Sequence, residues 1–479
     1  MDTALPLPVL PYLTADLPGI GGQIKQRPED FVVTEIPAYM PCGRGSHIYF
    51  GIEKTGVDTR SAVVQISQAL GRPARDIGYA GMKDRHAVAR QMLSVEHVDP
   101  ALVVKLDIPG IKVQWVSRHG NKIRLGHLRG NRFDIRIRNV PIDRLPDAQA
   151  ILDLLIRRGL PNYFGPQRFG VRGTGHQLGL ALLRGDDKEF LDQFLGRPIE
   201  GVDYGPMLRA RKLYDEGNFE HARNAWPGNH RDERAALSAL MHGRNPRRAL
   251  HAVDKYLRHF LVSALQSFLF NEVLIARLPT IDKVLVGDLA FKHGHGAVFR
   301  VTDPAAEQPR ADRVEISPSG PLYGSKMSWP TDEPEKIERE VIARYGVDIN
   351  WFSQGENHIR GDRRALRIPL VGAVKAGSAE PEPKEEGPQK IVFDAAPKPG
   401  EALLPKPPAE SADLVVPTLQ AGQDEAGSYL EVSFALPSGA YATILLRELM
   451  KAETAEAEEP PAGTEELPGG SEEEAPQEP

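Results

Sequence analysis

The chain has 479 residues, of which 41% are hydrophobic and 26% charged, and its formal net charge is −6. This length predicts two or more folded domains. No apolar run approaches the roughly 18 residues of a membrane span, and no basic start leads into an apolar stretch, which argues against a membrane or secreted protein. The single cysteine, Cys42, excludes an internal disulfide and a cysteine metal cluster. The cytoplasm is therefore the expected compartment.

The negative charge is concentrated near one end of the chain. Residues 371–479 carry 22 acidic and seven basic side chains, whereas the other 370 residues carry 43 acidic and 52 basic ones. Residues 376–411 mix Pro, Glu, Lys and Ala, and residues 452–479 hold ten acids and no base, compositions typical of disordered segments. The remaining body is moderately basic, which permits an RNA partner without requiring one.

Short strands and short helices alternate over the first 160 residues. In the first expected strand, Phe31 and Val33 alternate with Val32 and Thr34, which predicts a strand. A helix is expected to begin at Asp58 or Thr59 and to end at Gly71. The expected strands span 25–36, 47–53, 91–96 and 122–140, and the expected helices span 58–71 and 146–158.

The stretch 122–140 predicts a hairpin or two consecutive strands around Gly130. In its second half Phe133, Ile135 and Ile137 alternate with charged residues, so one face belongs to the core. The other face is either a solvated outer surface or a surface that binds RNA phosphates, and the pattern leaves both readings open. That face presents three arginines, Arg132, Arg136 and Arg138.

Residues 160–368 differ in composition, since 171–245 are rich in Arg, His and Gly with helical patches. They predict a second domain inserted into the first. Asn245 followed by proline predicts the start of helical sequence that continues to about Leu278. Its aromatic residues at near-helical spacing indicate a core face rather than a ligand site, and residues 283–327 return to short strands. The aromatic residues are Phe260, Phe268 and Phe270.

Alternation over Tyr429–Ala435 predicts a further strand, so the chain is expected to return from the low-complexity linker and complete the sheet of the first domain. Strands interleaved with short helices on brief connections predict an α+β fold with a mainly antiparallel sheet.

The most informative stretch, Gly78–Gln91, has one carboxylate among several cations. Asp84 lies among lysine, arginine and histidine side chains, just after a short strand that Gly81 is expected to end by virtue of its freedom to take positive φ. Nearby cations favour the ionised form of an acid. The pattern suits an enzyme acting on nucleic acid, and the alternative is a surface turn with salt bridges.

Ala80-Gly81-Met82-Lys83-Asp84 resembles the catalytic motif of the TruD-type tRNA pseudouridine synthases, and the resemblance covers most of residues 20–450. Further stretches agree with that family in the expected order: Lys25-Gln26-Arg27-Pro28-Glu29-Asp30-Phe31-Val32-Val33, Gly130-Asn131-Arg132-Phe133, Pro161-Asn162-Tyr163-Phe164-Gly165-Pro166-Gln167-Arg168-Phe169-Gly170, Leu436-Pro437-Ser438-Gly439-Ala440-Tyr441-Ala442-Thr443, and Arg447-Glu448-Leu449.

The resemblance implies a pseudouridine-synthase-like sheet with flanking helices and an inserted α+β domain. The domains expected are 1–159 for the first part of the catalytic domain, 160–368 for the insertion, 369–411 for the linker, 412–451 for the final part of the catalytic domain, and 452–479 for an acidic tail.

The activity that the resemblance implies is the isomerisation of uridine to pseudouridine, at position 13 in the D-arm of tRNA. The C1′–N1 bond breaks and a C1′–C5 bond forms, so neither a redox step nor a cofactor nor a metal is expected. Asp84 is the implied nucleophile. The sequence leaves open whether it attacks the sugar, adds to the uracil ring, or removes a ribose proton.

Five further residues match family positions that bind the substrate. Lys25 is expected to pair with Asp84, Asn131 to read the uracil edge or orient Asp84, and the three aromatic residues to enclose the base. Without the resemblance, the same residues are an exposed lysine, a turn asparagine and ordinary core aromatics. The enclosing residues are Phe31, Phe133 and Tyr441, the last standing where relatives often have phenylalanine.

Two other functions remain open to the sequence. A non-catalytic RNA-binding protein is one, although binding alone does not require a carboxylate in a buried pocket. A glycoside hydrolase is the other, which needs a second carboxylate such as Glu29 or Asp30. The candidate phosphate contacts, some expected to be structural ion pairs, are Arg85, Arg90, Arg132, Arg136, Arg168 and Arg172, with 209–212 and 244–248 in the insertion.

Overall fold

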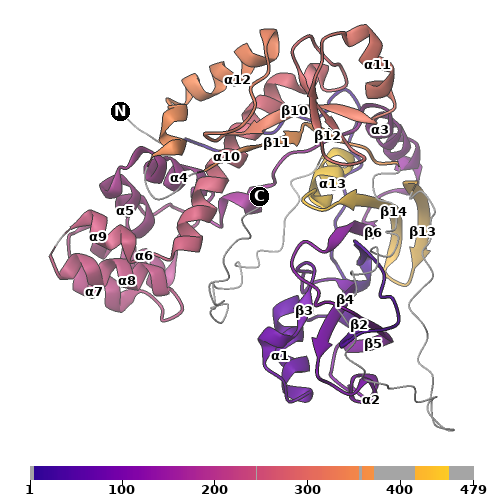
Figure 1. Cartoon of the computed structure of the whole chain (residues 1–479), viewed down its shortest axis with the longest axis horizontal. Coiled ribbons are helices and arrows are strands. Elements are labelled where there is room, and N and C mark those ends of the chain that lie inside the picture. Colours follow the sequence, from indigo (N-terminus) through magenta and orange to yellow (C-terminus); the bar gives the residue numbers. More distant parts are fainter. Residues whose placement is uncertain (1–4, 244, 355–358, 372–415, 452–479) are drawn as a thin grey trace, which may run out of the picture. The chain divides into compact units, whose positions relative to one another are not determined.

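The computed structural model describes residues 5–243, 245–354, 359–371 and 416–451 (Figure 1). These residues divide into two compact units. The sheet unit comprises 14–160 with 369–371 and 416–451, and the insertion unit comprises 5–13 with 161–368. Residues 5–13 thus group with the insertion unit, whereas the sequence predicts them in the first part of the catalytic domain, 1–159. The expected linker over 376–411 and the tail over 452–479 lie outside the described residues.

The sheet unit is built on one eight-stranded sheet in the order β13-β14-β6-β1-β4-β2-β5, with β3 paired to β4. The β1–β4 pair is parallel, and the other pairs described in this sheet are antiparallel. The mainly antiparallel α+β prediction is confirmed. The strands are β1 (Phe31–Pro37), β2 (His47–Thr55), β3 (Gly78–Tyr79), β4 (Val88–Glu96), β5 (Ile111–His119), β6 (Leu128–Arg138), β13 (Thr418–Asp424) and β14 (Gly427–Pro437).

The first helix of the sheet unit begins at its predicted capping residue. The carboxylate of Asp58 accepts a hydrogen bond from Ser61 N, so the first helix begins where expected. That helix buries Val63 and Ile66 against apolar side chains of β2 and β4. The helices are α1 (Thr59–Ala69), α2 (Pro100–Val104), α3 (Leu145–Arg158) and α13 (Ala442–Met450), with 3-10 turns η1 (Pro28–Asp30), η2 (Ala74–Asp76) and η3 (Ile142–Arg144).

Two strand predictions in this unit need correction. The expected hairpin over 122–140 is a single strand, β6, because residues 120–127 form a loop whose Gly126 N donates to Ala80 O at 2.9 Å. Strand β5 was missed, although Ile111, Val113 and Trp115 alternate with polar residues in its first half; most of its side chains are only partly buried.

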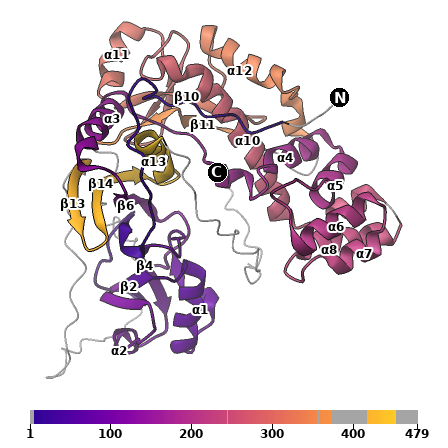
Figure 2. The same cartoon turned by 180° about the vertical axis from the view of Figure 1, so that it is seen from behind.

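The insertion unit combines a helical cluster with a second sheet, of which Figure 2 labels β10 and β11. The order of its strands is β11-β10-β8-β9. Its helices are α4 (Gly175–Arg184), α5 (Asp187–Leu195), α6 (Gly205–Asp215), α7 (Phe219–Ala225), α8 (Arg231–Met241), α9 (Pro246–His251), α10 (Lys255–Arg277), α11 (Pro304–Asp312) and α12 (Asp332–Arg344), with 3-10 turns η4 (Pro166–Phe169), η5 (Leu278–Thr280) and η6 (Ile349–Ser353). The strands are β8 (Leu289–Lys292), β9 (Val298–Arg300), β10 (Ile316–Leu322) and β11 (Asp362–Ala365), beside a separate pair of β7 (Leu160–Pro161) with β12 (Arg367–Ile368).

The expected helix from Asn245 to about Leu278 is two helices, α9 and α10. Asp254 separates them, because its carboxylate caps Tyr256 N and Leu257 N and starts a new helix. Among the described residues, α10 with η5 is long and apolar enough to cross a membrane, contrary to expectation, yet 67% of its apolar window is buried inside the protein. It packs against α4 and β10 and is the core helix of its unit.

Candidate active site

The turn that carries Asp84 joins β3 to β4 over residues 80–87. Gly78 permits a close approach here, because a Cβ at that position would lie 2.3 Å from Ile123 O and 2.6 Å from Ser94 Oγ. Gly81, in contrast, is not among the residues with positive φ, so the expected reason for a glycine there is wrong. A Cβ on Gly81 would meet Leu128 and the Lys83 ammonium only at ordinary contact distance, 3.4 Å.

Lys25 and Asp84 form an ion pair with 3.2 Å between Nζ and Oδ2, across 59 residues of sequence. The same ammonium lies 4.8 Å from the ring centroid of Phe31, in a cation–π arrangement. Lys25 has φ +57°, a left-handed conformation that costs a residue with a Cβ about 1–2 kcal/mol. Strained backbone of this kind is frequent at functional sites.

Asp84 is not in a buried pocket, because its side chain is 61% exposed. A buried carboxylate was the reason given above for favouring an enzyme over a non-catalytic RNA-binding protein, and that reason does not hold. The exposed carboxylate is instead oriented by Lys25, whose side chain is 24% exposed.

Buried aromatic rings lie under the Lys25 ammonium. Phe31 meets Phe133 edge to face with 6.3 Å between centroids, and Phe133 stacks on Phe434 at 5.2 Å. Val33 pairs with Phe133, and Phe434 pairs with Phe133 from the other side, so β1, β6 and β14 each contribute to this floor. Phe434 was missed as a site residue, although the predicted alternation of its strand placed it on the buried face.

Asn131 lies on the same face of β6 as Phe133, two residues before it. Its Oδ1 is buried and has no hydrogen-bond partner among the residues that the structure describes. A buried amide oxygen without a partner costs about 1–3 kcal/mol, so such a group calls for an explanation.

Tyr441 directly precedes α13 and lies in the short connection that follows β14. Leu436 pairs with Asn131, and the turn after β14 contains Gly439 at φ +82°. The structure therefore links Asp84, Lys25, Phe31 and Phe133 by direct contacts, with Asn131 on the same sheet face and Tyr441 five residues beyond the strand partner of Asn131.

Lys83 does not belong to the cations that surround Asp84. Its ammonium lies 3.2 Å from Glu35 Oε2, and both side chains are at least 95% buried. Glu35 Oε1 also accepts a hydrogen bond from Met92 N at 3.2 Å. Burial raises the pKa of the Glu35 carboxyl, against the opposing effect of Lys83. The Lys83–Glu35 pair joins the turn between β3 and β4 to strand β1.

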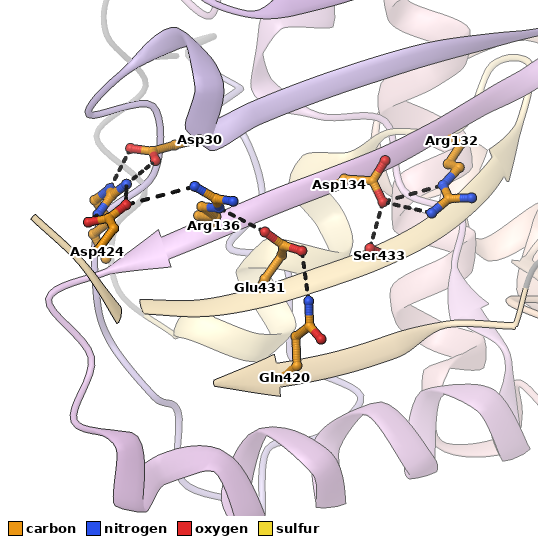
Figure 3. Close-up of polar contacts among 9 residues, drawn as sticks. Asp30, Arg132, Asp134, Arg136, Gln420, Asp424, Glu431 and Ser433 are labelled. Carbon is orange, nitrogen blue, oxygen red and sulfur yellow. Dashed lines mark hydrogen bonds and ion pairs between the residues drawn. The ribbon is translucent and has the colours of Figure 1, made fainter. Parts of the chain in front are cut away.

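The arginines on the outer face of β6 are paired within the sheet (Figure 3). Arg132 donates to Asp134, which also accepts from Ser433, and Arg136 donates to Glu431 at 2.7 Å. Four of the other candidate phosphate contacts also have partners in the protein. Arg85 donates to Gly56 O, Arg90 to Glu53, Arg168 to Ser263 and Ser267, and Arg172 to Gln193 O and Arg197 O.

In the insertion unit, Arg211 is buried and donates to Asp203 and to two backbone carbonyls, so its role is structural. Arg244 lies outside the described residues.

Asp30 is excluded as the second carboxylate of a hydrolase by its partners. It is fully buried, and its two oxygens accept hydrogen bonds from Arg138 at 2.6 and 2.7 Å. Arg138 also donates to both oxygens of Asp424 on β13. Figure 3 shows Asp30 and Asp424 close together. Asp30 further accepts from Arg27 N, so this cluster ties the returning hairpin to the turn between Lys25 and Phe31. The remaining candidate, Glu29, is exposed.

Replacing Asp30 with asparagine is expected to lower the free energy of unfolding by about 3 kcal/mol, because it leaves a buried guanidinium short of a charge partner. Urea unfolding would measure this. Asp134→Asn, which weakens the partly exposed Arg132–Asp134 pair on β6, should cost less than about 1 kcal/mol. An equal loss of unfolding free energy in the two variants would contradict a structural role for the Asp30–Arg138 pair.

The Arg138 hydrogen bonds hold the pKa of Asp424 well below its ordinary value of 3.8. A lowered folded-state pKa stabilises the protein above the unfolded-state value, and this contribution is lost as the pH falls toward the folded-state pKa. Asp424→Asn should therefore be less stable than the parent at pH 5–8, with the difference shrinking below about pH 4. A difference that stays constant down to pH 2.5 would contradict this origin.

Comparison with known proteins decides the family. The family model described as tRNA pseudouridine synthase D (TruD) matches residues 10–395. The chain belongs to the TruD family. It is 42% identical over 446 residues to the tRNA pseudouridine synthase D of Geobacter sulfurreducens, covering 92% of this chain and 96% of that one. The protein of the same name from Geobacter metallireducens is 42% identical over 442 residues, covering 92% and 97%.

The TruD fold is also shared with a solved structure. The crystal structure of the putative tRNA pseudouridine synthase D from Methanosarcina mazei matches with a TM-score of 0.73 at 25% identity, covering 92% of this chain and 96% of that one. Within the residues described for this TruD member, no three His, Cys, Asp or Glu side chains gather as a metal site.

Proposed function

We propose that this chain is a tRNA pseudouridine synthase that isomerises uridine 13 in the D-arm of tRNA, with Asp84 as nucleophile. Membership of the TruD family supports the reaction class. The observation that carries the assignment of the site is the 3.2 Å Lys25–Asp84 ion pair above the ring of Phe31. It places an oriented carboxylate next to aromatic surface, as needed to act on a nucleoside.

The reaction exchanges one bond for another within the same nucleotide. The C1′–N1 bond of uridine breaks, the detached uracil turns, and a C1′–C5 bond forms. C5 loses its proton and N1 gains one, so the product is an isomer of the substrate. Asp84 supplies the carboxylate that attacks and later assists that proton transfer. Lys25 holds the carboxylate in a single direction, so that it is in place when the base arrives.

The detached base requires a surface that holds it during the turn. Phe31, Phe133 and Tyr441 provide ring edges and faces for stacking, worth about 1–3 kcal/mol per base. The target lies within folded tRNA, so the base must be extruded or the arm locally rearranged. The chain is accordingly proposed to act in the cytoplasm on tRNA.

Asn131 is assigned to the base. Its unpartnered oxygen accepts a hydrogen bond from a uracil N–H. Because hydrogen bonds to a substrate discriminate strongly, loss of this one should lower turnover. Asn131→Ala is expected to lower kcat/KM about 10- to 100-fold while leaving the protein as stable as the parent or more so, since an unsatisfied buried group is removed. Parallel kinetics and thermal unfolding measure both. Lower stability with unchanged kcat/KM would contradict this role.

The experiment that tests the proposed function is incubation of the purified protein with unmodified tRNA, followed by chemical mapping of pseudouridine. Pseudouridine at position 13 is the expected product. Binding of tRNA without pseudouridine would favour a non-catalytic RNA-binding protein, and release of free uracil would indicate a hydrolase.

A further inference from the structure

The carboxylate of Asp84 is 61% exposed, so packing around the side chain does not hold it in place. Its direction depends on the backbone of the turn between β3 and β4. Residues Lys83 and Asp84 lie outside the strands, so their backbone N–H and C=O groups lack the ladder partners of a sheet. Together with the Lys25 ion pair, the groups that bond this backbone therefore decide where the carboxylate points.

Three of these backbone groups are bonded by two side chains from one short segment. The Thr59 hydroxyl accepts from Lys83 N at 2.8 Å. The Lys54 ammonium donates to Lys83 O at 3.1 Å and to Asp84 O at 2.9 Å. In addition, the guanidinium of Arg85 donates to the backbone of the same segment, at Gly56 O.

Both side chains are themselves fixed and buried. Lys54 is 0% exposed and Thr59 2% exposed. The ammonium donates its third hydrogen bond to Val57 O at 2.6 Å, and the threonine hydroxyl donates to Gln91 Oε1 at 2.9 Å. A buried ammonium is costly unless its donors are satisfied. Here the carbonyls that satisfy it include those of the nucleophile and its neighbour.

We propose that Lys54 and Thr59 are positioning residues that hold the backbone of the Asp84 turn and thereby aim the catalytic carboxylate. Neither side chain is required to touch the substrate. Displacement of a reacting group by about 1 Å is sufficient to cost about 100-fold in rate, so loss of these bonds acts on turnover rather than on tRNA affinity. The inference rests on the proposed isomerase function with Asp84 as its carboxylate.

The test uses matched substitutions in the full chain. Thr59→Val keeps the shape and removes the hydroxyl, and Thr59→Ser keeps the hydroxyl; Lys54→Met removes the ammonium, and Lys54→Arg keeps a cation. Val63→Ala, in the buried face of α1, is the control that weakens the same region without touching the turn. For each, kcat and KM on unmodified tRNA are measured, together with the unfolding temperature and amide exchange of residues 80–86 in the free protein.

We expect Thr59→Val and Lys54→Met to lower kcat about 10- to 100-fold with KM within about twofold of the parent. Exchange over 80–86 should be about fivefold faster. Thr59→Ser should recover most of the rate, and Val63→Ala should lower the unfolding temperature while keeping kcat. If Lys54→Met does not fold, the two threonine variants decide.

The proposal is overturned if Thr59→Val keeps the kcat of the parent, if KM rises while kcat does not change, or if Val63→Ala loses as much activity. Failure of the proposed function looks different: a parent protein that makes no pseudouridine removes the kinetic comparison, yet the exchange of residues 80–86 still shows whether Thr59 and Lys54 hold the turn.

Discussion

Asp84→Asn is expected to abolish pseudouridine formation, lowering turnover about 10⁴-fold or more, because the reaction loses its attacking carboxylate. The free energy of unfolding should change by less than about 0.5 kcal/mol, since the side chain is largely exposed. Affinity for tRNA should stay within a few-fold of the parent. Single-turnover mapping of pseudouridine on unmodified tRNA measures the rate.

Two further variants complete this experiment. Asp84→Ala gives the same loss and cannot regain a carboxylate by hydrolysis of an amide. Asp107→Asn, an exposed aspartate between α2 and β5, is the matched control and should keep full activity. Unchanged turnover in Asp84→Asn would remove Asp84 from its role, whatever the family.

Lys25→Met is expected to lower kcat about 100-fold, because the carboxylate of Asp84 loses the ammonium that orients it at 3.2 Å. Lys25→Gly separates this effect from the backbone. At φ +57° a glycine relieves strain, so this variant should be at least as stable as Lys25→Met and equally inactive.

The combination of retained stability and lost activity distinguishes a functional lysine from a structural one. Lys105→Met, at an exposed position after α2, is the control and should behave as the parent does. Full activity in Lys25→Gly would show that the ion pair does not contribute to turnover, and a large loss of stability would show that its role is structural.

Local sequence was sufficient where a property depends on neighbours along the chain. The Asp58 cap of α1, the alternation that buries Phe31 and Val33, and the α+β class all followed from short-range patterns, as did membership of the TruD family through its motifs. Asp84 was predicted as the nucleophile from its motif alone. These are features that the conformational preferences of short segments determine.

Only the tertiary structure decided which charges meet. The arginines of β6 were open to two readings until the strands that return after residue 416 brought Asp424 and Glu431 beside them. Lys54 gave no signal as the support of the Asp84 turn, because the carbonyls it bonds lie about 30 residues further along the chain. Ion pairs and buried hydrogen bonds depend on which residues are close in space. The order of the strands brings together residues that are far apart in sequence, and their separation along the chain does not predict that contact.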